Sequence, residues 1–157
     1  MLVRRLPAWH GNVGKRLIRS PKVYVRDSGL VHALLGLPTL DAVLSHPVAG
    51  ASWEGFVIEQ LIHAAPQAQA DFYRTSNGAE VDLVLTFRNQ QRWSIEIKRS
   101  SAPQVSKGFY QASTDLAAVR KLLVAPVEQP YPLREGIEVV NLMKAIEWVA
   151  EQDRHQD

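Results

Sequence analysis

Three charged side chains interrupt two strand-like segments in the middle of the chain. Asp82 lies in the apolar stretch of residues 79–87, and Glu96 and Lys98 lie in the next such stretch, residues 92–100. Hard divalent cations such as Mg²⁺ bind carboxylate oxygens, keep several waters and leave room for a phosphate. A bound ion lowers the pKa of a water that attacks phosphorus, and a neighbouring lysine can orient that water or stabilise the phosphate oxygens. These residue types therefore predict a metal-dependent phosphodiesterase site.

The spacing of the hairpin decides whether the two acids can meet. Side chains alternate across a strand, so Glu96 and Lys98 share one face of theirs. A three-residue loop at residues 89–91 would pair Asp82 with Lys98 and Val84 with Glu96. Asp82 and Glu96 would then lie diagonally, with β-carbons about 6–8 Å apart, which is close enough for both carboxylates to bind one cation.

Two simpler explanations account for the same charges. Alternating charged and apolar residues are typical of a strand with one solvated face, and Lys98 could neutralise Asp82 across the hairpin. The combination favours a metal site, because Glu54, at the start of the preceding helix, supplies a third acid. Ile95 and Ile97 also indicate a central strand, where a charge is costly unless it has a function.

The elements that would position these residues alternate between helix and strand. Runs of β-branched and aromatic residues predict strands at residues 22–25, 70–75, 79–87, 92–100, 121–126 and 137–141. Helical spacing predicts helices at residues 28–37, 52–65, 105–117 and 142–152, with Asp27, Ser52 and Asn141 as N-caps. Residues 1–20 show no clear periodicity and predict an irregular arm. The order predicts an α/β fold, a central mixed β-sheet flanked by helices on both faces.

The basic residues are concentrated at the N-terminus. The formal net charge is +2, yet residues 1–26 hold seven of the 18 lysines and arginines and none of the 16 acids, so the remainder carries −5. Such a cluster attracts phosphate backbones, but it can equally be a solvated arm or a surface that docks on an acidic partner. The residues that we expect to contact nucleic acid are Arg4, Arg5, Lys15, Arg16, Arg19 and Arg99.

Composition disfavours several other kinds of site. The chain has no cysteine, which rules out disulfides and thiolate metal sites, and its five histidines lack zinc-binding spacing. The segment GNVGKR, residues 11–16, has the wrong glycine spacing for a phosphate-binding loop, so we expect no ATPase site. No apolar run resembles a signal peptide or a membrane span, so we expect a cytoplasmic protein without membrane contact.

Four segments together resemble the PD-(D/E)XK nuclease superfamily, which has the restriction-endonuclease-like fold. They are SPKVYVRDSGLVHALLG, ASWEGFVIEQLI, FYRTSNGAEVDLVL and WSIEIKRS. More narrowly, the chain resembles domain of unknown function 4143, which follows an ATPase module in many bacterial and archaeal AAA-type proteins. The resemblance implies Glu54, Asp82 and Glu96 as metal ligands and, with Lys98, as catalytic residues. Val81 replaces the proline that often precedes the first acid of the motif.

The resemblance also implies a domain organisation and a function. Residues 1–45 would be a basic arm with a short strand and helix that connects to an ATPase portion, 46–150 the nuclease-like domain, and 151–157 a frayed tail. The domain would be a Mg²⁺- or Mn²⁺-dependent nuclease that cleaves or binds DNA, with an AAA-type ATPase module as its partner in cis or in trans. The alternative is a non-catalytic interaction module of such an ATPase, with the acids in a structural network. The accessory candidates, for which we favour a surface position, are Glu80, Lys107 and Gln111.

Overall fold

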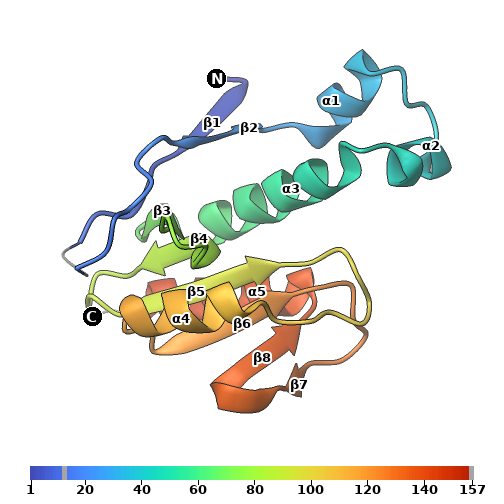
Figure 1. Cartoon of the computed structure of the whole chain (residues 1–157). Helices are drawn as coiled ribbons and strands as arrows, with labels where there is room; N and C mark the ends of the chain where they lie inside the picture. The colour runs from blue at the N-terminus through green and yellow to red at the C-terminus, as the bar shows by residue number, and fades with distance from the viewer. Residues whose placement is uncertain (12–13, 156–157) are drawn as a thin grey trace.

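The computed structural model describes residues 1–11 and 14–155, and its centre is a six-stranded mixed sheet (Figure 1). In their order across the sheet, the strands are β3 (Gln69–Arg74), β4 (Glu80–Thr86), β5 (Arg92–Ile97), β6 (Arg120–Val124), β8 (Ile137–Val140) and β7 (Tyr131–Pro132). The pairs β3–β4 and β4–β5 are antiparallel, β5–β6 and β6–β8 are parallel, and β7 is an antiparallel edge. The predicted α/β architecture with a central mixed sheet is confirmed.

Each face of the sheet has its own apolar core. The long helices are α3 (Ala49–Ala64), α4 (Lys107–Asp115) and α5 (Leu142–Arg154). α3 and α5 pack against Leu83 and Ile95 on one face, and Phe109 of α4 packs with Val84 on the other. β5 is buried along almost its whole length, which confirms its predicted central position. In the described part of the chain, no helix is both long enough and apolar enough to cross a membrane.

The N-terminal arm is more regular than the sequence predicted. β1 (Val3–Leu6) pairs antiparallel with β2 (Lys22–Val25) in a separate two-stranded sheet. The chain after β1 then follows the edge strand β3: the backbone N–H of Trp9 donates to the carbonyl of Phe72 at 2.7 Å, and that of Phe72 donates to Pro7 at 2.9 Å. The prediction of an irregular arm is wrong for β1, because the unpaired strand edges supply backbone partners that a sequence pattern does not display.

The remaining helices are short: α1 (Ser28–Leu34), α2 (Leu40–Ser45) and a 3₁₀ turn, η1 (Arg134–Gly136). Asp27 caps α1 and Asn141 caps α5, as predicted. α5 runs through residues 151–154, which were expected to fray, and Asp153 is buried there. Outside the described residues lie 12–13 of the GNVGKR segment and 156–157 of the tail.

α3 begins earlier than predicted. Its first residue is Ala49, and no side chain at Val48 caps it. Ser52, the predicted N-cap, lies inside the helix, with its hydroxyl 2.7 Å from Nε2 of His32. Glu54 therefore lies in the second turn of α3 rather than in the first.

The β4–β5 hairpin has a different register from the predicted one. Its loop is residues 88–90, one residue earlier than expected, because the backbone of Phe87 pairs with that of Gln91. Gln90 has a φ of 64°, the left-handed conformation that closes three-residue hairpin loops. As a result Val84 pairs with Ser94, and the predicted pairing of Val84 with Glu96 is wrong.

β4 also carries a bulge beside β3. The register with β3 shifts by one residue between Val81 and Val84, so Asp82 and Leu83 together face one residue of β3. Val81 consequently packs in the same core as Val84, whereas Leu83 packs in the opposite one. Strict alternation, which would put Val81 and Leu83 on one face of β4, therefore fails at the bulge.

Candidate functional site

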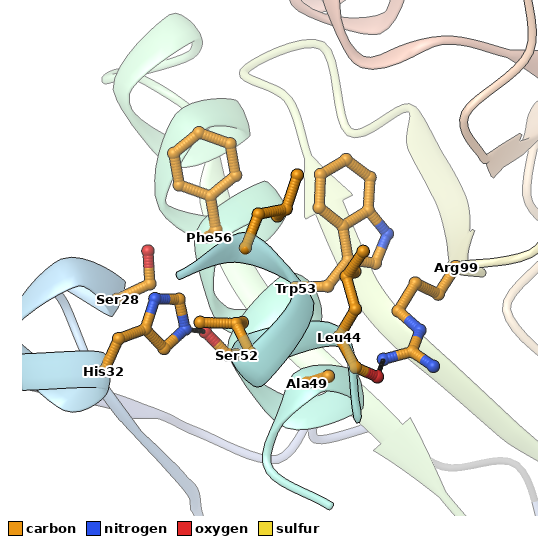
Figure 2. A pocket seen from close by; sticks show the side chains of 10 residues that line it. Ser28, His32, Leu44, Ala49, Ser52, Trp53, Phe56 and Arg99 are labelled. Atoms are coloured by element: carbon orange, nitrogen blue, oxygen red, sulfur yellow. Dashed lines mark hydrogen bonds between the residues drawn. The ribbon is translucent and has the colours of Figure 1, made fainter. Parts of the chain in front are cut away.

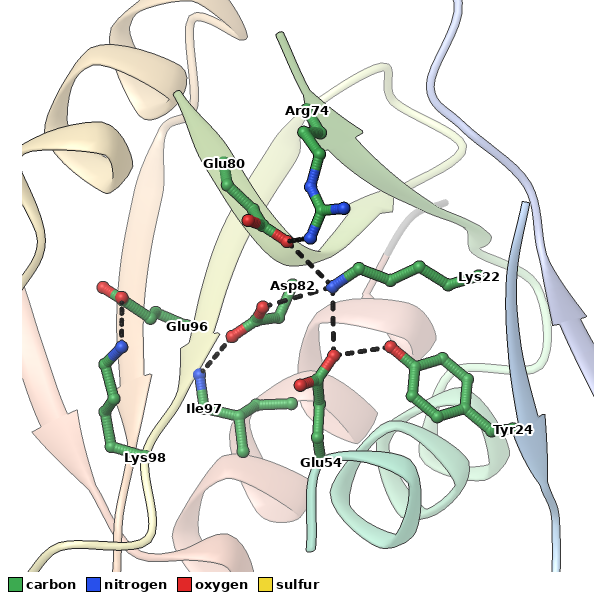
Figure 3. Close-up of polar contacts among 9 residues, drawn as sticks. All are labelled: Lys22, Tyr24, Glu54, Arg74, Glu80, Asp82, Glu96, Ile97 and Lys98. Atoms are coloured by element: carbon green, nitrogen blue, oxygen red, sulfur yellow. Dashed lines mark hydrogen bonds and ion pairs between the residues drawn. The ribbon is translucent and has the colours of Figure 1, made fainter. Parts of the chain in front are cut away.

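The residues of the predicted motif line one cleft. It has a volume of about 410 Å³ and lies where β2, α3, β4 and β5 meet (Figure 3). Its acidic lining is Glu54, Glu80, Asp82 and Glu96, and its basic lining is Lys22, Arg74 and Lys98. The other lining residues are Gly78, Ser106 and Gly108. The fold thus brings Glu54, Asp82, Glu96 and Lys98 together from three separate elements.

Asp82 stands where β4 separates from β5. Continuing the hairpin register by one pair places Asp82 opposite Glu96, so the predicted pairing with Lys98 is wrong. Oδ2 of Asp82 accepts a hydrogen bond from the backbone N–H of Ile97 at 2.9 Å. The carboxylate thereby satisfies a buried strand donor and is held on the β5 side of the cleft.

Lys22 occupies the centre of the acidic residues (Figure 3). Its Nζ lies 3.0 Å from Oε1 of Glu54, 3.0 Å from Oε1 of Glu80 and 3.4 Å from Oδ1 of Asp82. Burial alone would lower the pKa of Lys22, but the three negative charges outweigh burial and raise it. From the sequence, Lys22 was assigned only to the basic N-terminal cluster of residues 1–26. The available signal was the alternation of β2, which puts Lys22 and Tyr24 on one face.

The charge of Asp82 is nonetheless incompletely compensated. The pKa of Asp82 is raised to about 6, because burial and the charge of Glu54 raise it by more than Lys22 and the N–H of Ile97 lower it. The side chain is 16% exposed. An ionised carboxylate in this position is stabilised by any additional cation that enters the cleft.

The antiparallel pair β1–β2 (the N-terminal hairpin) packs close to α3 through Tyr24 and Gly55. The Tyr24 hydroxyl donates to Oε1 of Glu54, and burial together with this hydrogen bond raises the pKa of Tyr24. A Cβ at Gly55 would lie 3.1 Å from Cδ1 of the Tyr24 ring. Glycine at this helical position, which costs helix stability, therefore allows the close approach of the tyrosine.

Glu80 lines the cleft, with its side chain 33% exposed. It pairs with Arg74 in the β3–β4 register, and the Arg74 guanidinium donates to its Oε1. Burial alone would raise the pKa of Glu80, but the hydrogen bonds and charges of Arg74 and Lys22 outweigh burial and lower it. Glu80 is therefore an ionised member of the group around Lys22, not an isolated surface acid.

Glu96 is the most buried acid of the cleft. The residue is 5% exposed, and its Oε1 lies 2.8 Å from Nζ of Lys98. Its Oε2 is buried and has no hydrogen-bond partner. Burial lowers the pKa of Lys98, but the hydrogen bond and charge of Glu96 outweigh burial and raise it, so the ammonium stays protonated. A buried carboxylate oxygen without a donor is rare in folded proteins, where a water, a cation or a proton supplies the partner.

Comparison with known families assigns most of the chain. Residues 49–145 match the family described as domain of unknown function (DUF4143). The chain belongs to the DUF4143 family. Residues 1–41 match a second family, also described as a domain of unknown function (DUF8612). The narrower resemblance drawn from the sequence is thus confirmed, while membership of the PD-(D/E)XK superfamily stays a prediction.

Two mycobacterial proteins are similar to this DUF4143 chain. They are Uncharacterized protein Rv2008c of Mycobacterium tuberculosis (strain ATCC 25618 / H37Rv) and Uncharacterized protein Mb2031c of Mycobacterium bovis (strain ATCC BAA-935 / AF2122/97). Each is 41% identical over 140 residues, which make up 89% of this chain and 32% of the relative. The chain therefore spans about a third of the length of these relatives.

One solved structure shows a weak similarity. It is the refined half-complex from the tetradecameric assembly of Thermococcus gammatolerans McrB AAA+ hexamers with bound McrC, and the alignment covers 66% of this chain and 32% of that chain. The sequence identity is 15% and the TM-score is 0.45. This similarity is too low to support a conclusion about fold or function.

One further cleft adjoins the acidic cleft of the DUF4143 chain, and a second cleft adjoins the first. The first, about 510 Å³, shares Gly78 and Gly108 with the acidic cleft, and its lining includes Lys15 and the accessory candidates Lys107 and Gln111. The second, about 690 Å³, shares Lys15 with the first and is also lined by the predicted nucleic-acid contacts Arg16 and Arg19. The basic residues of the arm thus reach the acidic cleft through a chain of neighbouring depressions.

The other predicted nucleic-acid contacts lie elsewhere. Arg4 of β1 binds Glu59 of α3, and its neighbour Arg5 is exposed. Arg99 donates to the carbonyl of Leu44 at 3.3 Å, beside an apolar cavity (Figure 2). None of these three arginines lines any of the three clefts just described.

The apolar cavity has a volume of about 250 Å³ and lies between α1, α2 and α3 (Figure 2). Its lining is Ser28, His32, Leu40, Val43, Leu44, Ala49, Ser52, Trp53, Phe56 and Arg99. Leu40, Leu44 and Phe56 keep 70%, 49% and 38% of their surface exposed, so the cavity opens onto an apolar surface. The His32–Ser52 hydrogen bond is not accompanied by an acid, and we assign no catalysis to this cavity.

The acidic cleft offers the chemical type of donor that a divalent cation takes. Carboxylate oxygens are the ligands that Mg²⁺ and Mn²⁺ take in proteins, and Glu96 offers one that is buried and unpaired. Within residues 1–11 and 14–155 no three side chains of histidine, cysteine, aspartate or glutamate form a preformed metal site. In this arrangement Lys22 holds Glu54 and Glu80, and Lys98 holds one oxygen of Glu96.

Proposed function

We propose that the acidic cleft is the active site of a Mg²⁺- or Mn²⁺-dependent phosphodiesterase that acts on nucleic acid, DNA in the first instance. The observation that carries the proposal is the buried, unpaired Oε2 of Glu96 in a cleft that Asp82 and Lys98 also line. A divalent cation would supply a partner for this oxygen. The raised pKa of Asp82 supports the same need for positive charge.

The roles of the residues follow from their charges. Asp82 and Glu96 would hold the ion, with Glu54 as the third acid at the rim. The ion would supply a water of lowered pKa and would offset the charge that develops on the phosphate. Lys98, whose pKa is raised, is an ammonium and would donate a hydrogen bond to a non-bridging phosphate oxygen rather than act as a base. The water would lose a proton to solvent as its oxygen bonds to phosphorus, and the leaving sugar oxygen would part from phosphorus and take a proton from solvent.

The surroundings of the cleft favour a long polyanion over a small phosphodiester. Two basic depressions extend from it toward the arm, and Lys107, Arg16 and Arg19 are exposed in them. Cations placed along a groove bind successive phosphates and make affinity dependent on salt. We therefore expect a nucleic-acid strand to pass from the acidic cleft over these depressions.

The test is cleavage of plasmid and single-stranded DNA with Mg²⁺ or Mn²⁺, with EDTA as the metal-free control. Lys98→Ala should abolish cleavage. Lys144→Ala is the matched control, because Lys144 is also 37% exposed and also lies 2.8 Å from a glutamate, but on α5. Cleavage that persists in Lys98→Ala or in EDTA, or no cleavage by folded wild-type protein with either metal, would contradict the proposal.

A second function rests on the apolar cavity. The surface around Leu40, Leu44 and Phe56 is suited to bind another protein segment, and about two thirds of each mycobacterial relative lies outside the matched region. The chain would then be an interaction module of an AAA-type ATPase, as the family resemblance implies. The test is binding of this chain to the remaining part of the Mycobacterium tuberculosis relative, expressed separately. Leu44→Asp should abolish binding if the cavity is the docking site.

A further inference from the structure

The ammonium of Lys22 lies among three carboxylates, in the position where a second cation would otherwise bind. An ammonium has three N–H donors, and Nζ of Lys22 lies within 3.4 Å of three carboxylates, those of Glu54, Glu80 and Asp82. These acids come from α3 and β4, and among the described residues the only other cation paired with them is Arg74, at Glu80. A compact point charge surrounded by oxygens is also how a hard divalent ion would be held.

The charge balance of the cleft leaves room for one further ion. On the Lys22 side, three carboxylates face two cations, Lys22 and Arg74, which leaves one negative charge. On the other side, Glu96 and Lys98 balance each other. One divalent ion added to this set leaves an excess of one positive charge and two ions leave an excess of three, whereas two ions in a cleft without Lys22 leave an excess of two, so Lys22 disfavours the second ion.

The position of Lys22 is fixed by its neighbours on the hairpin. Tyr24, two residues further along β2, donates to the same oxygen of Glu54 that Lys22 contacts. Arg26 follows on the same face and lies 3.0 Å from Glu59, one turn further along α3. Three consecutive side chains of one face thus bind α3, so Lys22 is a positioned group rather than a mobile surface lysine.

We propose that Lys22 takes the place of a divalent cation among Glu54, Glu80 and Asp82, and so restricts the cleft to a single divalent ion held by Asp82 and Glu96. The inference rests on the proposed function for the ion at Glu96. It adds that the second position of a two-ion site is filled by a residue of this chain. Lys22 would then be a specificity-determining residue that sets the metal stoichiometry.

The experiment counts bound Mn²⁺ per chain, by the loss of the free-ion electron paramagnetic resonance signal, for wild type and Lys22→Met. Lys22→Met should bind one ion more than wild type, and its unfolding temperature should rise with Mn²⁺ more than that of wild type. Arg26→Met is the matched control, because it removes a cation from the same hairpin that contacts Glu59 instead of the cleft. It should leave the count unchanged.

A second variant keeps the test decisive where Lys22→Met is poorly folded. Lys22→Gln keeps a hydrogen-bond donor toward the three acids without the charge, and it should also bind one ion more than wild type. Equal Mn²⁺ counts for wild type and folded Lys22→Met would overturn the inference. The inference is tested by the difference in Mn²⁺ count between Lys22→Met and wild type, so it can fail separately from the proposed function. No ion in wild type and one in Lys22→Met would refute the ion at Glu96 and support the role of Lys22. One ion in each would support the ion at Glu96 and refute the role of Lys22.

Discussion

Nζ of Lys22 lies 3.0 Å from Oε1 of Glu54, and this contact joins two segments that match different families. Lys22 belongs to the region 1–41 that matches DUF8612, and Glu54 to the region 49–145 that matches DUF4143. The acidic cleft is therefore a product of both segments. An account of the DUF4143 part alone would leave out the cation at the centre of its acids.

Tyr24→Phe should destabilise the chain without abolishing the fold. The change removes the hydroxyl that donates to Glu54 and leaves the ring against Gly55. A hydrogen bond to a charged group contributes about 1.5–3 kcal/mol, so we expect a decrease in the free energy of unfolding in that range. Urea unfolding followed by circular dichroism measures it. Tyr131→Phe, on the exposed edge strand β7, should have little effect, and an equal loss in both variants would contradict this role of Tyr24.

Lowering the pH should weaken the ion pairs that join Arg4 and Arg26 of the N-terminal hairpin to Glu59 of α3. Burial alone would raise the pKa of Glu59, but the hydrogen bonds and charges of Arg4 and Arg26 lower it below its ordinary value, about 4.3. In acid the unfolded chain therefore binds the proton before the folded one does. The resulting stability is complete above the unfolded pKa and is lost as the pH falls through the lower, folded pKa.

The measurement is the free energy of unfolding as a function of pH for wild type and Glu59→Gln. Wild type should lose stability below about pH 4.3, and the variant should show a smaller loss over that interval. Glu147→Gln, at an exposed position of α5, should follow wild type. Parallel curves for wild type and Glu59→Gln would contradict the assignment.

Adding one methyl group should have opposite effects at two helical glycines. A Cβ at Gly108 in α4 would lie 2.4 Å from the carbonyl oxygen of Gly78, so Gly108→Ala forces two backbone segments apart at the edge of the cleft. We expect it to cost about 1–3 kcal/mol. Gly50 in α3 has nothing within 4 Å of such a Cβ, and Gly50→Ala should stabilise by about 0.5–1 kcal/mol. Thermal unfolding of both variants tests the pair, and a neutral Gly108→Ala would contradict it.

The sequence predicted the residues of the cleft better than their pairing. Alternation and capping located β4, β5 and the N-caps Asp27 and Asn141, because these depend on neighbours along the chain. The pairing of β4 with β5 was predicted wrongly, because it depends on the left-handed conformation of Gln90. The faces of β4 depart from strict alternation because of a bulge at Asp82, which no periodicity in the sequence displays. Lys22 was missed for a related reason. Its partners are 32 to 60 residues away and become neighbours only when the hairpin packs on α3.

The central claim is that the cleft binds a divalent ion through the free oxygen of Glu96. The most direct measurement is calorimetric titration of Mn²⁺ into wild type, Glu96→Gln and the control Glu147→Gln. Wild type and Glu147→Gln should bind one ion each, and Glu96→Gln should bind it more weakly by about tenfold or more. Equal affinity in wild type and Glu96→Gln, or no binding by folded wild-type protein, would contradict the account.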